Sequence, residues 1–88
     1  EDDDGNTPLI IACKYGNENI VKYLIDKGAD VNKKDKYKNT PLIIACEKDN
    51  ESIIKILVDH GANINKENKK GETPLSIINE NKNENIFL

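Results

Sequence analysis

Apolar residues come in short clusters that recur along the chain. The run Leu9–Cys13 returns residue for residue as Leu42–Cys46. A second cluster follows each run, and its apolar positions in residues 20–25 are spaced i, i+1, i+4, i+5, as they are again in residues 53–58. That spacing puts one apolar stripe on a helix face. The pattern therefore predicts pairs of short helices separated by polar stretches.

Capping residues mark where the first helix of each pair begins. The tripeptide Thr-Pro-Leu starts at Thr7, Thr40 and Thr73, 33 residues apart each time. Thr is a good N-cap, and Pro is tolerated at the first helical position because its missing N–H would have no partner there. We therefore expect a short helix to begin at the proline of each copy, and Gly16 to end the first one.

The second helix of each pair has its own signals. Asn17, Asn50 and Asn83 each stand before a Glu, and Asn is a strong N-cap while Glu in the first turn complements the helix dipole. Gly28 and Gly61 follow the second apolar clusters and are expected as left-handed C-caps. The polar stretch after each Gly, rich in Lys, Asn and Asp, predicts a turn or hairpin.

The whole chain is repetitive at this spacing. Residues 2–34 match residues 35–67 at 19 of 33 positions, and residues 68–88 match the second copy at 9 of 21. We divide the chain into repeat 1 (1–34), repeat 2 (35–67) and a truncated repeat 3 (68–88). No unit can bury its apolar stripes alone, so the units are expected to stack side by side.

This pattern resembles the ankyrin repeat, a 33-residue unit of two antiparallel helices and a projecting β-hairpin or turn. The resemblance rests on the three Thr-Pro-Leu copies and on the pairs Gly28-Ala29 and Gly61-Ala62. It implies an all-α solenoid of stacked helix-turn-helix units with projecting β-hairpin or turn fingers. Because repeat 3 stops inside its second helix, we expect an internal piece of a longer repeat protein, or a chain that associates with neighbours.

The resemblance also implies a function, because ankyrin stacks bind protein partners through hairpin tips and a concave face of first helices. Tyr37 and Tyr15 are the favoured hot spots, since Tyr offers rigid amphipathic area. The alternative is a structural spacer within a longer ankyrin array. The implied partner-binding residues are Asp3, Asp4, Asn6, Lys36, Tyr37, Asn39, Lys69, Lys70 and Glu72 at the tips, Lys14, Tyr15, Glu47 and Lys48 on the helix face, and His60 in a loop.

Composition narrows the classes of function. The net charge is −3 with 13 Lys and no Arg, which disfavours nucleic-acid binding. A single His and the absence of a phosphate-binding or nucleophile motif predict a non-enzyme without cofactor or metal. No apolar run is long enough to span a membrane, and the acidic start is unlike a signal peptide. We therefore expect an intracellular, cytoplasmic location.

Four side chains carry further expectations. Cys13 and Cys46 occupy the same slot, and packed helices lie about 8–10 Å apart, too far for a disulfide, so both are expected to be buried thiols. Tyr23 and Phe87 align with apolar helix positions and are expected to pack. The resemblance makes Asn32 a candidate for asparaginyl hydroxylation, with the alternative that its side chain ties the turn.

Overall fold

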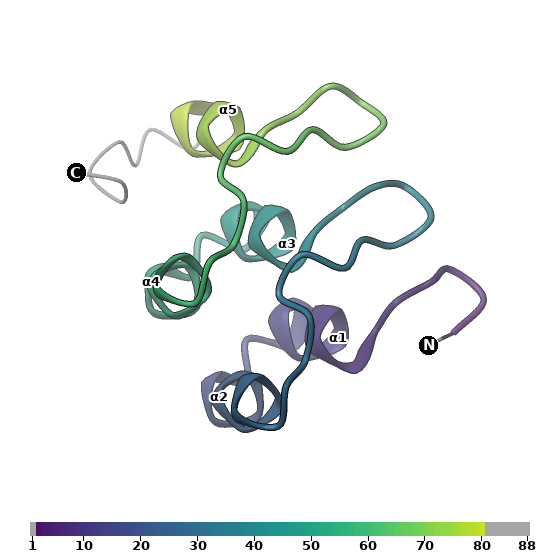
Figure 1. Cartoon of the computed structure of the whole chain (residues 1–88). Coiled ribbons are helices and arrows are strands. Elements are labelled where there is room, and N and C mark those ends of the chain that lie inside the picture. Colours follow the sequence, from purple (N-terminus) through teal and green to yellow (C-terminus); the bar gives the residue numbers. More distant parts are fainter. Residues whose placement is uncertain (1, 81–88) are drawn as a thin grey trace.

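The computed structural model describes residues 2–80, and in it the helices stack in two rows (Figure 1). One row holds the first helix of each repeat and the other holds the second helices of repeats 1 and 2. The first row is α1 (Pro8–Tyr15), α3 (Pro41–Glu47) and α5 (Pro74–Glu80), and the second is α2 (Glu18–Asp26) and α4 (Glu51–Asp59). No strand occurs within residues 2–80, so the projections are turns rather than β-hairpins there.

The predicted caps form at the helix starts. The hydroxyls of Thr7 and Thr40 each accept a hydrogen bond from the backbone N–H three residues on, at 3.2 Å. Asn17 and Asn50 cap α2 and α4 in the same way. These bonds satisfy N–H groups that have no partner inside the helix. Asn83 and the second helix expected after it lie outside the described residues.

Left-handed residues end the helices and shape the turns. Gly28 and Gly61, predicted as C-caps, have φ values of 93° and 91°. Lys38 has a φ of 62° and stands one period after Gly5 and one before Gly71, both at 76°. A left-handed conformation costs an L-residue about 1–2 kcal/mol. The turn at Lys38 therefore has the same left-handed backbone as the turns at Gly5 and Gly71, although a lysine disfavours that conformation.

The core runs through each helix pair and continues across the boundaries between the repeats. α3 packs on α1 and on α5 as well as on α4, and every residue of Pro41–Cys46 is buried. Leu42 and Ile43 are fully inaccessible, as are Ile10 and Val21 from repeat 1. Burial of a Leu or Ile side chain contributes about 1.5–3 kcal/mol. The apolar side chains of α3 in repeat 2 thus pack against repeat 1 and repeat 3.

The expected buried thiols are found, but one packing prediction is wrong. Cys13 and Cys46 are buried and form no disulfide, and burial raises the pKa of each to about 12. Tyr23 is 59% exposed, and its ring faces solvent with the Lys27 ammonium 5.6 Å from its centre. It belongs neither to the buried core nor to the partly buried residues packed against that core. Phe87 lies outside the described residues.

Three polar projections extend from the first row of helices (Figure 1). We call residues 2–6, 35–39 and 68–72 finger 1, finger 2 and finger 3. Each begins with a side chain, that of Asp2, Asp35 or Asn68, whose Oδ1 accepts backbone N–H groups two and four residues on, at 2.9–3.0 Å. Asx side chains favour such turns. The same chemistry therefore shapes all three fingers.

Backbone hydrogen bonds join each finger to the next. The Lys36 N–H donates to the carbonyl oxygen of Asp4, and the Lys69 N–H donates to that of Tyr37, both at 2.9 Å. The two bonds are one period apart, so they repeat the same contact. They fix the spacing of the fingers, which decides where their side chains meet.

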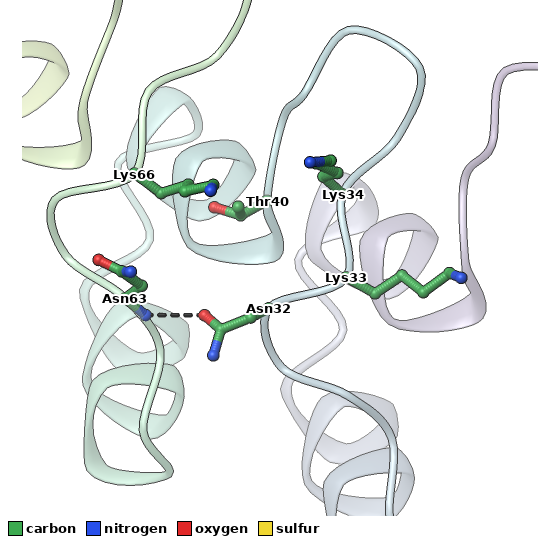
Figure 2. Close-up of a pocket in the computed structure, with 6 residues that line it drawn as sticks. All are labelled: Asn32, Lys33, Lys34, Thr40, Asn63 and Lys66. Carbon is green, nitrogen blue, oxygen red and sulfur yellow. Dashed lines mark hydrogen bonds between the residues drawn. The ribbon is translucent and has the colours of Figure 1, made fainter.

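The side chain of Asn32 ties repeat 1 to repeat 2. Its Oδ1 accepts the N–H of Asn63 at 2.8 Å, drawn as a dashed line in Figure 2, and its Nδ2 donates to the carbonyl oxygen of Gly61 at 3.2 Å. Asn65 stands one period later, and within residues 2–80 its side chain makes no corresponding bond to another repeat.

Replacing Asn32 should therefore weaken the stack where the same change at Asn65 should not. Two exposed hydrogen bonds contribute roughly 1 kcal/mol together, so Asn32→Ala should lower the free energy of unfolding by about that amount. Asn65→Ala should change it by less than about 0.5 kcal/mol. Urea denaturation followed by circular dichroism measures both. Equal losses in the two variants would contradict a tie specific to Asn32.

Candidate functional site

A groove lies between finger 2, finger 3 and the C-terminal end of α3. Its volume is about 260 Å³. Repeats 2 and 3 both contribute to it, so it exists only when the two are stacked. The lining residues are Tyr37, Asn39, Glu47, Asn68, Lys69, Lys70 and Glu72. All except Asn68 are among the residues that the resemblance implied, and the structure brings those six together.

A buried amide, that of Asn68, holds the two fingers of the groove together. Asn68 is only 7% exposed, and its Nδ2 donates to Asn39 Oδ1 at 2.9 Å and to Glu72 Oε1 at 2.8 Å. The Oδ1 of Asn68 shapes finger 3 through its backbone bonds. This one side chain thus connects finger 2 to the carboxylate of Glu72. The sequence analysis did not single out Asn68, although its position one period after Asp35 could have indicated this role.

An aromatic ring and an ion pair form the outer edge. Tyr37 is 49% exposed, and the ammonium of Lys36 lies 5.1 Å from the centre of its ring. The same ammonium lies 2.8 Å from Asp4 Oδ1, which joins finger 2 to finger 1. Its hydrogen bond to the Asp4 carboxylate raises the pKa of Lys36. Two of the implied tip charges are therefore already paired with each other.

Glu47 is the titratable group that the groove perturbs. Its partial burial raises the pKa of the Glu47 carboxyl, and the negative charge of Glu72 raises it further. Lys70 acts in the opposite direction but does not cancel these effects. Burial and a like charge both disfavour the charged form. The charged form of Glu47 is therefore disfavoured in the groove, chiefly by burial.

The remaining implied residues lie outside this groove. Asn6 is 5% exposed, with its amide bound to Asp2 and to the ammonium of Lys14, so it offers almost no surface to a partner. Asp3 is exposed on finger 1, and Lys48 is the C-cap of α3.

Tyr15 and His60 lie further from the groove. Tyr15 is 84% exposed and lines a different surface, with Pro8 and Ile11. His60 ends α4, where its Nδ1 lies 2.8 Å from the carbonyl oxygen of Ile56 and donates a hydrogen bond to it. Hydroxylation of Asn32 stays a prediction, and its side chain bonds to Gly61 and Asn63 of repeat 2 rather than to its own turn, which was the alternative.

Within residues 2–80 the structure contains neither a membrane-spanning helix nor a cluster of metal ligands. No helix there is both long and apolar enough to cross a membrane. That part of the chain also contains no group of three or more metal-ligating side chains.

The raised pKa of Glu47 gives a test of the groove's electrostatics. Glu72→Gln removes a like charge while keeping an oxygen for Asn68, so it should lower the pKa of Glu47, which burial still holds above 4.5. Lys70→Gln should raise it further. Since the folded state binds the proton more tightly, this carboxyl makes stability fall as pH rises above 4.5 through the folded pKa.

Carboxyl titration by NMR measures these shifts. Glu18→Gln is the control, because Glu18 pairs with Lys22 on α2, outside the groove. An unchanged Glu47 pKa in the Glu72→Gln variant would contradict the arrangement.

Comparison with known proteins agrees with the observed fold. The family described as ankyrin repeat matches residues 4–36, and the one described as ankyrin repeats (many copies) matches residues 24–78. An ankyrin repeat protein of Fowlpox virus (strain NVSL) is 54% identical over 28 residues, 32% of this chain and 15% of that protein. One of Acanthamoeba polyphaga mimivirus is 62% identical over 34 residues, 39% of this chain and 18% of that protein.

These alignments cover only a small part of the two viral proteins. They therefore show similarity in the repeat and say nothing of the activity of the whole proteins. Ankyrin repeats are generally protein–protein interaction modules without enzymatic activity. With its period of 33 residues, its helix pairs and its capped fingers, the chain belongs to the ankyrin repeat family.

Proposed function

We propose that the chain is a protein-recognition module that binds an extended segment of a partner in the groove between finger 2 and finger 3. The segment would carry a basic side chain into the groove. The observation that carries this proposal is the pair of carboxylates, Glu47 and Glu72, on one hollow surface where partial burial raises the pKa of Glu47.

A cation from a partner would offset the cost that partial burial imposes on the charged form of Glu47. An ammonium or guanidinium beside Glu47 would favour its charged form. Lys69 and Lys70 line the same groove, so an acidic residue next to the partner's basic one would fit them, while a run of basic residues would be repelled. Like-charge contacts of this kind contribute to specificity.

Tyr37 is the proposed anchor. Its ring is half exposed at the groove edge, and tyrosines are enriched among interface hot spots because they add contact area at low entropic cost. Asp3 and the Asp4–Lys36 pair would extend the surface toward finger 1. Asn6 is left out of the proposed surface because it is buried.

A structural spacer within a longer array is the second candidate. Pro8, Ile11 and Ile20 are exposed on the outer face of repeat 1, the last two at 38% and 46%. Their counterparts one period later, Pro41, Ile44 and Ile53, are buried. A further unit stacked on α1 and α2 would cover this face as repeat 1 covers repeat 2. We also propose an intracellular location. Cys13 and Cys46 are buried thiols rather than a disulfide, as is usual in reducing compartments.

Matched tyrosine variants test the binding proposal. Tyr37→Ala removes the anchor, and Tyr23→Ala removes another exposed tyrosine with a lysine over its ring but on α2, away from the groove. Loss of a hot spot costs at least about 2 kcal/mol. Tyr37→Ala should therefore reduce capture of a bound partner from a lysate of the source cells more than tenfold, while Tyr23→Ala keeps it.

Quantitative mass spectrometry of the captured proteins gives the readout, with folding of each variant checked by circular dichroism. A Glu47→Gln, Glu72→Gln double variant should lose the same partners as Tyr37→Ala. Identical partners and amounts from all of these proteins would contradict the proposal and favour the spacer.

A further inference from the structure

Two adjoining hollows lie apart from the groove, beside the loops that follow α2 and α4. The first, about 420 Å³, lies between residues 32–34 and 63–66 in front of Thr40 (Figure 2). The second, about 410 Å³, shares Lys34 and Lys66 with it. The first is lined by Asn32, Lys33, Lys34, Thr40, Asn63 and Lys66, and the second adds Lys38, Asn65, Glu67 and Thr73.

The side-chain oxygens that line the first hollow are already engaged as acceptors. Asn32 Oδ1 accepts the Asn63 N–H at 2.8 Å, and Asn63 Oδ1 accepts the Asn65 N–H at 2.9 Å. Thr40 Oγ1 accepts the Ile43 N–H at 3.2 Å as the cap of α3. Each of these bonds also orients its side chain. What the hollow offers a ligand is therefore mainly hydrogen-bond donors.

Several donors face this space. The Nδ2 group of Asn63 has no acceptor within residues 2–80. In Figure 2 the ammonium group of Lys66 extends toward Thr40, whereas Lys33 points the other way, toward repeat 1, and Lys34 lies between them on the loop. A carboxylate accepts hydrogen bonds through both of its oxygens and donates none. The set of groups therefore suits an oxyanion.

Charge favours the same kind of ligand. In the described part of the chain Lys34, Lys38 and Lys66 form no ion pair. Glu67 is the one acidic side chain that lines either hollow. The chain as a whole has a net charge of −3, so this surface has the opposite sign to the molecule. An acidic ligand would be drawn to it.

We propose that the two hollows form a docking site for an extended acidic peptide segment of a protein partner, with its carboxylates on Lys34, Lys66 and Lys38. Two adjoining hollows that share lysines fit a ligand with several carboxylates better than a single ion. A nucleic acid fits less well, because neither hollow has an aromatic side chain for base stacking. The site shares no residue with the groove and does not depend on it.

Binding of a fluorescein-labelled hexaglutamate peptide tests the site, with hexaglutamine as the uncharged probe. Fluorescence anisotropy at low salt should show hexaglutamate binding that weakens as salt rises. Lys34→Gln with Lys66→Gln should weaken it roughly tenfold, the sum of two exposed ion pairs. The control, Lys22→Gln with Lys55→Gln, removes the same charge from α2 and α4, where each lysine has an acidic partner, and should change affinity less than twofold.

Any of four results would overturn the proposal. The first is an equal loss of affinity in the two double variants, which would indicate a response to net charge alone. The second is equal binding of hexaglutamine, and the third is tighter binding of an oligothymidylate or of inorganic phosphate through Lys34 and Lys66. Amide NMR shifts on adding hexaglutamate should centre on Asn63 and Asn65, and shifts centred on finger 3 instead would also overturn it.

Discussion

The burial of apolar surface between neighbouring repeats is the constraint on which the rest of this structure depends. A short helix pair exposes too much apolar side chain to be stable alone, and isolated helices of seven to nine residues are marginal in water. α3 shows the solution, since it contacts α1 on one side and α5 on the other. The contrast between buried Ile44 and its exposed counterpart Ile11 shows what the stacking contributes.

Both proposed binding surfaces follow from that stacking. The groove combines Tyr37 from one repeat with Glu72 from the next, and backbone bonds between fingers fix their spacing. The two hollows beside Lys34 and Lys66 likewise lie between loops of adjacent repeats. Neither surface is encoded within one 33-residue unit. Recognition in this chain is a property of pairs of repeats, which lets exposed residues vary while the packing residues stay the same.

Local chemistry made much of the fold predictable from the sequence. Thr7, Asn17 and Gly28 act on backbone groups within a few residues, so their roles as caps could be read directly. The resemblance named six residues that line one groove, and their part in binding is a proposal. The exposure of individual side chains was harder to predict, because it depends on which neighbouring segment of the folded chain covers each one. Tyr23 occupies an apolar position yet faces solvent, and Asn6 is buried because Asp2 and Lys14 bind its amide.

The most direct test of repeat-on-repeat stabilisation is native-state hydrogen exchange in a Leu42→Ala variant. Leu42 is fully buried in α3, and such a change costs about 2–5 kcal/mol. If the repeats hold one another, backbone amides of α1 and α2 should lose protection together with those of α3 and α4, although the change lies outside repeat 1. Full retention of protection in α1 and α2 would show that repeat 1 folds on its own, and would contradict the account.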